Sequence, residues 1–371
     1  MDYNKIDAIA ISLEDRFGRL VTSALVSLIL MSAAALYVRP AVHCTALGNL
    51  YSQLAANPFG DLTGNYVGFR ILTPLISYLI GLRGDLIIVT NMIIASAFIA
   101  LIYIYFRQRS PRPGDALVAA TVMTFSMVTL STIYYGGYCD SLTYMIIFLM
   151  YWFRSKRFLF YILFFLGMLN RESIAFLLPW FIFMSYSESN SKIKWFMDML
   201  LGYGICFALL FVYREWMLTR GTIAFTTSYY LTPLLKDPFH WFRNSYTFQG
   251  LGLFTVFKAL WIFPAVALVS FKRSKLNVHI AMAILILLGS LAQLFIAYDS
   301  SRMLSMSFMV MIILLEHLFK NDTFFFRSWV VFILILNLFV PQLYTASHVV
   351  ETMHSTFSKI FMKVYLGNEG W

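Results

Sequence analysis

Long apolar runs alternate with short polar segments along almost the whole chain. The runs lack the strict alternation of polar and apolar positions that marks membrane β-strands, and they are long enough to form helices. They fall at 20–38, 85–106, 116–134, 141–153, 158–170, 173–187, 195–213, 251–271, 277–297, 303–319 and 328–341. We therefore predict an all-α polytopic transmembrane protein of about 11 spans, with residues 1–371 forming a single integral membrane domain.

The composition agrees with this pattern. Of the 371 residues, 60% are hydrophobic and only 12% are charged, whereas about a quarter of the residues in soluble domains are charged. The mean hydropathy is +0.73. These values exclude a soluble enzyme, a disordered chain and a disulfide scaffold. They also exclude a signal peptide followed by a soluble domain, because apolar runs recur as far as residue 341.

The net charge of +10 comes from short basic clusters between the apolar runs. Such clusters are topology signals rather than a binding face for nucleic acid, which we do not expect as a partner. With a cytoplasmic N-terminus, the clusters at 107–112, 154–157, 192–194, 272–275 and 320–327 all fall on the cytoplasmic side.

This topology requires that the apolar stretch 69–82 does not cross the bilayer. The stretch is short and is interrupted by Pro74 and Gly81, which favours a juxtamembrane or re-entrant helix. The outer side then carries a first loop at 39–84 that contains this helix, and a second loop at 214–250. Apolar residues at helical spacing predict an interfacial amphipathic helix over 345–366.

Single charged residues gather in the outer segments. An ionisable group at a membrane-embedded helix end costs free energy unless it is paired or faces a polar cavity. A polar cavity opening to the outer leaflet would explain the whole set, which comprises Asp61, Arg70, Asp140, Arg171, Glu172, Asp299 and Arg302.

Two of the carboxylates are candidate catalytic groups. Asp61 lies in the segment NPFGDLTGNY, where Pro, Gly and Asn interrupt regular structure. It is either a general base for an acceptor hydroxyl or a loop carboxylate that caps a helix or pairs with Arg70. Asp140 in GYCDSLTY begins a span, where it either serves in catalysis or complements the positive end of the helix dipole.

The arginines are candidate phosphate ligands. A guanidinium forms two parallel hydrogen bonds to an anionic oxygen pair, so Arg302 and Arg70 are suited to phosphate. The alternative is that each only reaches lipid headgroups. Asp299 lies one turn before Arg302 and is placed to orient it.

The turn Asn170-Arg171-Glu172 and Lys258 leave further alternatives open. Arg171 and Glu172 either contact substrate, with support from Asn170, or pair with each other or with Asp140 to fix the cavity wall. Lys258 lies within an apolar run. It either extends its amine to the interface or neutralises a phosphate or carboxylate.

No cofactor is predicted. The three cysteines and six histidines show no metal-ligand spacing. A divalent metal is therefore compatible with the sequence but not indicated by it.

The layout resembles the GT-C class of polytopic membrane glycosyltransferases, which use polyprenyl-phosphate-linked sugar donors. The likeness rests on NPFGDLTGNY and FRILTPLISYLIG in the first outer loop, on YDSSRMLSMSF at 298–308, and on the NRES and GYCDSLTY turns. It covers most of the chain as architecture. The chain differs from many members in lacking a paired acidic motif in the first loop and a large C-terminal soluble domain, so Asp140 stays a candidate base beside Asp61.

The resemblance implies transfer of a sugar from polyprenyl phosphate to a glycan, lipid or protein acceptor, with inversion, on the outer face of a bacterial inner membrane. Asp61 would act as base, and Arg302, with Arg70, Arg171 or Lys258, would bind the donor phosphate. Such a role belongs to cell-envelope polysaccharide biosynthesis, with membrane lipids as surroundings. The alternatives are a lipid-linked polysaccharide polymerase or ligase, and a lipid-linked sugar flippase or transporter.

Overall fold

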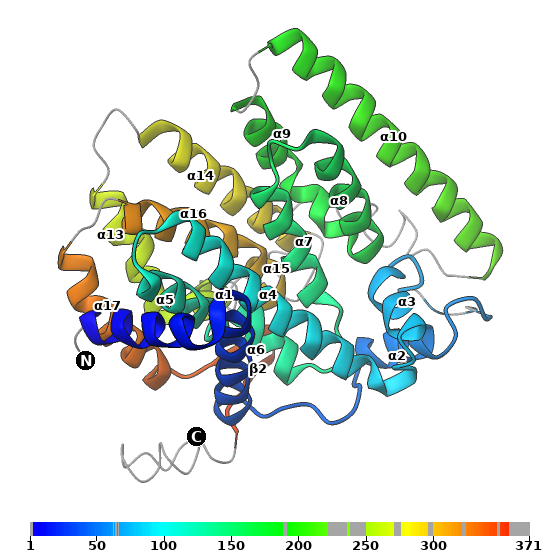
Figure 1. Ribbon diagram of the computed structural model, residues 1–371. Coiled ribbons are helices and arrows are strands. Elements are labelled where there is room, and N and C mark those ends of the chain that lie inside the picture. The colour runs from blue at the N-terminus through cyan, green and yellow to red at the C-terminus, as the bar shows by residue number, and fades with distance from the viewer. Residues whose placement is uncertain are drawn as a thin grey trace.

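The computed structural model describes residues 3–61, 63, 65, 67–187, 191–221, 236–237, 250–270, 276–295, 300–320, 324–346 and 349–355. Over these residues the regular secondary structure is helical apart from one short strand pair, which confirms the predicted α class (Figure 1).

The longer helices follow the apolar runs of the sequence, and 3-10 turns join several of them. In chain order the α-helices are α1 (Tyr3–Tyr37), α2 (Leu47–Ala56), α3 (Leu72–Leu79), α4 (Ile87–Arg109), α5 (Pro113–Thr124), α6 (Met127–Tyr134), α7 (Asp140–Trp152), α8 (Arg157–Asn170), α9 (Leu178–Ser187), α10 (Lys192–Thr219), α13 (Ile262–Ser270), α14 (Leu276–Ala292), α15 (Ser300–Leu304), α16 (Phe308–Lys320) and α17 (Phe324–Phe339). The 3-10 turns are η1 (Gly84–Leu86), η2 (Glu172–Leu177), η3 (Lys258–Trp261), η4 (Gln293–Phe295) and η5 (Ser305–Ser307).

Five described helical segments are long and apolar enough to cross a membrane. They are Tyr3–Tyr37, Gly84–Arg109, Lys192–Thr219, Val278–Phe295 and Ser300–Lys320. Helices α5 and α6 add a sixth candidate if they form one span bent by 49°. These helices identify the chain as an integral membrane protein.

The structure thus supports five to six spans in the described residues rather than the predicted 11. The difference comes from short apolar helices that the sequence pattern counted as spans. Helix α7 has 13 residues, which at 1.5 Å per residue gives about 20 Å, less than the ~30 Å hydrocarbon core.

Burial separates a central helix from a peripheral one. In the most apolar 18-residue stretch of Ser300–Lys320, which includes α16, 83% of the residues are buried. In the corresponding stretch of α10, 11% are buried. Figure 1 shows α10 running along one edge of the molecule. The exposed apolar face of α10 is therefore suited to lipid, and α16 forms part of the protein core.

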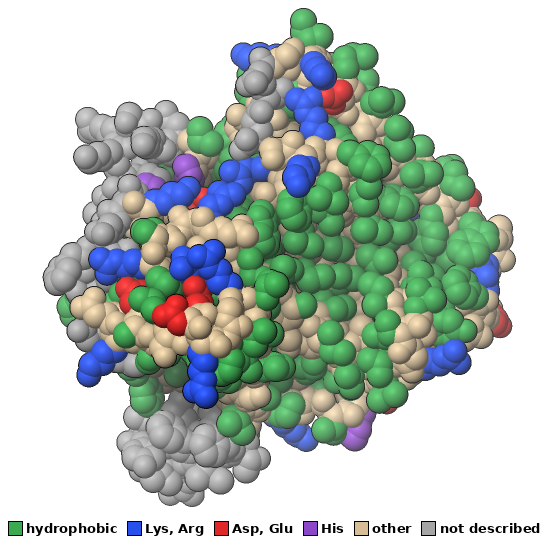
Figure 2. Space-filling model, in the orientation of Figure 1, with side chains coloured by type: hydrophobic (Ala, Val, Ile, Leu, Met, Phe, Trp, Pro, Cys, Tyr) green, Lys and Arg blue, Asp and Glu red, His purple; other side chains and the backbone are tan. Residues whose placement is uncertain are grey.

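Helix α1 breaks at Gly18, whose φ of 74° and ψ of 161° are not helical. Its first part turns away from its second part (Figure 1). Asp7 accepts a hydrogen bond from the backbone N–H of Gly114 at 2.7 Å, and Glu14 pairs with Arg107 at 2.9 Å. The first part is thus fastened to α5 and α4, and Figure 2 shows acidic and basic side chains gathered on this side of the molecule.

The segment 39–84, predicted to form the first outer loop, contains the short helices α2 and α3. With only eight residues, α3 is too short to cross a bilayer. Helix α10 continues to Thr219, so it extends into the range predicted as the loop 214–250. Residues 222–235 and 238–249 of that range lie outside the described residues.

The C-terminal helix predicted over 345–366 is not helical where it is described. Strands β1 (Leu343–Ala346) and β2 (Val349–Thr352) pair antiparallel, with Leu343 opposite Thr352. The paired strands are also held to α15, because the backbone N–H of Thr345 donates to Ser301 Oγ at 2.7 Å. Residues 356–371 lie outside the described residues.

Candidate functional site

Asp140 is the first residue of α7, and it receives two arginines. Arg302 Nε donates to Asp140 Oδ2 at 2.6 Å, and Arg171 pairs with Oδ1. The three residues are only 3–4% exposed. A carboxylate and two guanidiniums are therefore held together away from water, where charge–charge interactions are strong.

The three charged side chains come from separate parts of the chain. Arg171 lies at the junction of α8 and η2, and Arg302 lies in α15. The Arg302 guanidinium stacks 3.9 Å from the centroid of the Tyr138 ring. Tyr144 donates its hydroxyl to the Arg302 carbonyl at 3.4 Å. These contacts fix the position of Arg302 beside Asp140.

Asn170 connects the surrounding elements. Its amide nitrogen donates to the carbonyl of Cys139 and to Thr143 Oγ1, both at 2.8 Å. Its amide oxygen accepts from Thr73 Oγ1 at 2.7 Å and from the Thr73 backbone N–H at 3.2 Å. Asn170 therefore joins the end of α8 to the start of α7 and to α3, as a supporting residue for the neighbouring charges.

Arg70 and Glu172 form a second ion pair next to this group. Arg70 Nε lies 2.8 Å from Glu172 Oε2, and Arg70 Nη1 donates to Tyr51 Oη at 3.2 Å. Their side chains are 28% and 45% exposed. Since Glu172 adjoins Arg171, this more open pair links the segment 39–84 to the buried group.

Asp61 lies apart from these contacts. It is exposed, and its carboxylate accepts from the Thr63 backbone N–H at 2.9 Å and from Thr63 Oγ1 at 2.6 Å. The hydrogen bonds from the Thr63 hydroxyl and backbone hold the pKa of Asp61 below its usual value. Nearby, Arg220 at the end of α10 donates to the Gly60 carbonyl at 2.9 Å.

Lys258 occupies a different place in the fold from the Asp140 group. It is 1% exposed and has a φ of 50°, in the left-handed region. Its amine donates to Tyr37 Oη at 3.0 Å and to the Val340 carbonyl at 3.2 Å. These bonds join η3 to α1 and to the segment after α17. Asp299 lies outside the described residues.

Sequence reasoning missed several residues of the site and a second charged group. Thr73 and Tyr138 lie within segments already singled out, and an aromatic two residues before Asp140 was the available signal. Glu316 lies inside the apolar run 303–319 and was overlooked, although a single carboxylate within such a run indicates a paired or functional group. It receives Arg109 at 3.0 Å and Lys320 at 2.7 Å.

The buried group contains side chains of the kind that bind anions. Two guanidiniums are held by one carboxylate, and each guanidinium carries five N–H donors in a planar fork. Such forks match the oxygens of phosphate. Among the residues that the structure describes, no group of three or more His, Cys, Asp or Glu side chains is placed to hold a metal ion.

No protein-family model matches this chain, and neither a curated protein nor a solved structure shows significant similarity to it.

Proposed function

We propose that the protein is a membrane glycosyltransferase of the GT-C type, which transfers a sugar from a polyprenyl-phosphate donor on the outer face of a bacterial inner membrane. The N-terminus lies in the cytoplasm, and several of the short apolar helices complete crossings beside the long ones. The observation that carries the proposal is the convergence of Arg171 and Arg302 on Asp140 in a buried group.

The phosphate of the donor would lie against the two guanidiniums. When the bond from the anomeric carbon to the phosphate oxygen breaks, negative charge grows on the leaving phosphate. Donors already fixed in place stabilise that charge without reorganising, and a dry site strengthens the effect. Arg70, next to Glu172, would guide the phosphate from the more open side.

Asp61 is the better candidate for the base that takes the proton of the acceptor hydroxyl. Both oxygens of Asp140 are engaged by arginines, so its protonation would break ion pairs. Asp140 is therefore assigned to hold the arginines. Asp61 is exposed and is kept ionised by Thr63, and acceptor binding would have to bring the hydroxyl to it.

The test uses purified protein in lipid nanodiscs with a panel of polyprenyl-phosphate sugars. Release of free polyprenyl phosphate is followed for the parent, for Arg302→Ala and for Asp61→Asn. Arg83→Ala is the matched control, because Arg83 is an exposed arginine that stacks on Tyr78 at 4.4 Å outside the buried group. The proposal expects release by the parent and the control, and its loss in both test variants.

Two other results have a definite meaning. Release that survives Asp61→Asn would refute Asp61 as the base. Asp140, which also pairs with Arg171 and Arg302, would then be the remaining candidate for that role. Absence of release with every donor, together with labelled lipid crossing the bilayer in vesicles, would replace the transferase with a flippase.

A further inference from the structure

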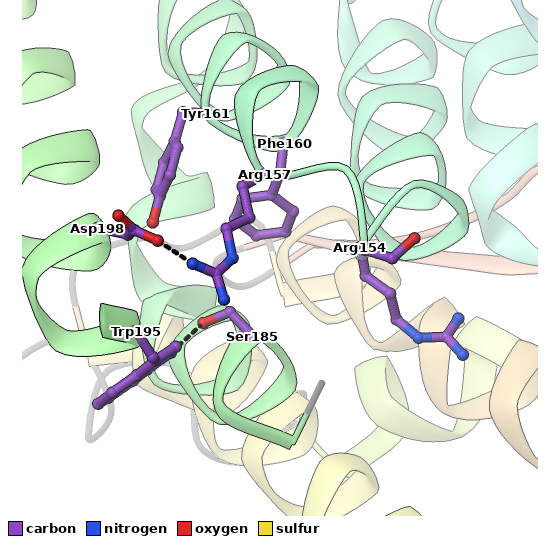
Figure 3. A pocket seen from close by; sticks show the side chains of 8 residues that line it. Arg154, Arg157, Phe160, Tyr161, Ser185, Trp195 and Asp198 are labelled. Carbon is purple, nitrogen blue, oxygen red and sulfur yellow. Dashed lines mark hydrogen bonds and ion pairs between the residues drawn. The ribbon is translucent and has the colours of Figure 1, made fainter. Parts of the chain in front are cut away.

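A second polar site lies at the opposite end of α8 from Asn170. A cavity of about 120 Å³ opens there between the start of α8, the end of α9 and the start of α10 (Figure 3). It is lined by Arg154, Ser155, Arg157, Phe160, Tyr161, Ser185, Trp195 and Asp198. The volume exceeds that of a few water molecules, so a small polar group fits inside it.

This cavity is separate from the Asp140 group. Helix α8 begins at Arg157, beside the cavity, and ends at Asn170, which contacts the residues around Asp140. Thirteen residue steps at 1.5 Å each put about 20 Å between the two ends. The cavity and the Asp140 group therefore lie at opposite ends of α8.

The polar atoms of the cavity are held in place. Arg157 pairs with Asp198, and Figure 3 shows its guanidinium between Asp198 and Ser185. Trp195 Nε1 donates to Ser185 Oγ at 2.9 Å, which joins α10 to α9. The Arg157 and Asp198 side chains are 40% and 36% exposed, so a ligand can reach both of them.

Basic residues dominate the surroundings of the cavity. Figure 2 shows Lys and Arg side chains gathered near the end of α9 and the start of α10. Arg154 and Lys156 precede α8, and Lys192 and Lys194 begin α10. These are the clusters that the positive-inside rule assigns to the cytoplasm. Tyr161 and Trp195 supply the amphipathic rings that favour the membrane interface.

We propose that this cavity binds the phosphate of an anionic phospholipid headgroup from the cytoplasmic leaflet. Basic pockets between membrane helices on this side are suited to such headgroups. Arg157 is the principal ligand, Arg154 lies at the rim, and Ser185 completes the polar wall. The acyl chains would extend along the exposed apolar face of α10. The proposal does not depend on glycosyl transfer.

Asp198 gives the proposal a sharp test, because its carboxylate opposes an anion and competes for Arg157. The full-length protein in detergent is titrated with phosphatidylglycerol and with phosphatidylcholine of the same acyl chains, and bound lipid is counted by native mass spectrometry. Arg157→Gln should weaken phosphatidylglycerol binding roughly tenfold or more, since a direct hydrogen bond to a charged group contributes about 1.5–3 kcal/mol. Asp198→Asn should strengthen the same binding.

Lys156→Gln is the matched control. It removes one positive charge from the same loop, but Lys156 does not line the cavity and lies over the Phe153 ring at 5.4 Å. The affinity of the Lys156→Gln variant for phosphatidylglycerol should stay close to that of the parent protein. Thermal unfolding of each variant identifies any loss of folding, and the opposite shifts expected for Arg157→Gln and Asp198→Asn cannot both come from destabilisation.

Three results would overturn the proposal. The first is an equal loss of binding in Lys156→Gln, which would mean diffuse attraction to the basic surface. The second is equal affinity for phosphatidylcholine and phosphatidylglycerol. The third is displacement of phosphatidylglycerol by inorganic phosphate alone, which would indicate a site for a soluble anion.

Discussion

Two buried carboxylates, Asp140 and Glu316, each bind two cationic side chains, but in different surroundings. Arg171 and Arg302 around Asp140 have side chains that are 4% and 3% exposed. Arg109 and Lys320 around Glu316 are 29% and 52% exposed. Only in the Asp140 group are both positively charged side chains buried within the protein.

The difference agrees with the proposal that the Asp140 group binds a ligand and that the Glu316 group is structural. Tyr105 and Tyr151 also donate to Glu316, at 2.7 and 3.1 Å, so this carboxylate fastens α16 to α4 and α7 while its cations keep their solvation. Burying two guanidiniums with one carboxylate costs desolvation that the ion pairs do not reliably recover. Because the ion pairs of the Asp140 group contribute little net stability, anion binding explains the group better than stabilisation of the fold does.

The largest expected effect is on stability when the carboxylate at the centre of each group is removed. Asp140→Asn leaves Arg171 and Arg302 buried beside a neutral amide, so the free energy of unfolding should fall by about 3–5 kcal/mol. Glu316→Gln should cost less, about 1–3 kcal/mol, because its cations are partly exposed while Tyr105 and Tyr151 lose a charged acceptor. Denaturant unfolding of both variants in the same detergent measures the difference, and equal losses would contradict the comparison.

The next effect concerns activity. Arg302→Ala should reduce release of polyprenyl phosphate roughly 100-fold, the loss typical when one donor to developing charge is removed. Arg302→Lys should recover little of it, since an ammonium has no planar face for Tyr138 and no fork for phosphate. Arg109→Ala, in the Glu316 group, should leave the rate per folded molecule unchanged. A similar fall in Arg109→Ala would mean that the two groups do not differ in function.

Asn170 should show an intermediate effect. Asn170→Ala removes the partners of Thr73, Thr143 and the Cys139 carbonyl, so we expect a loss of about 1–3 kcal/mol in the free energy of unfolding. Asn337 donates to the Phe125 carbonyl at 3.2 Å, which makes Asn337→Ala a control with fewer bonds. If both variants lost equal stability, the linking role of Asn170 would be refuted.

The smallest effect is a shift in pH dependence. Thr63 holds the pKa of Asp61 below its usual value, so Asp61 stays ionised to lower pH than a free carboxylate would. Thr63→Val removes the hydroxyl and should raise that pKa, which moves the acid limb of the activity profile to higher pH. Thr63→Ser keeps the hydroxyl and should leave the limb in place. An unchanged acid limb in Thr63→Val would show that another group controls it.

Much of the fold and part of the site followed from the sequence. Apolar runs locate the helices because a segment buried in lipid must be apolar and must satisfy its own backbone hydrogen bonds. Single charges in the predicted outer turns indicated Asp140, Arg171 and Arg302. The pattern did not reveal which turns meet, because that depends on how helices pack. It therefore grouped Lys258 with the arginines, whereas Lys258 binds Tyr37 and the carbonyl of Val340.

Two further differences have local causes. Of the predicted 11 spans, five to six correspond to described helices long and apolar enough to cross a membrane, because hydropathy does not report whether a short helix is covered by protein or by lipid. The strand pair at 343–352 was missed because its hydrogen bonds to the serines of α15 are long-range contacts, which helical periodicity does not register.

The break at Gly18 has a consequence for how the first helix fits its surroundings. A straight helix of 35 residues would be about 52 Å long, well over the ~30 Å hydrocarbon thickness. From residue 19 to Tyr37 the length is about 28 Å, which suits one crossing. Gly18 thus divides a helix that is too long for one crossing into two parts. The second part has a length suited to a membrane span, and the first part packs against α4 and α5. An alanine at position 18 would have to adopt a backbone conformation, with φ of 74° and ψ of 161°, that essentially only glycine occupies, at a cost of roughly 1–3 kcal/mol.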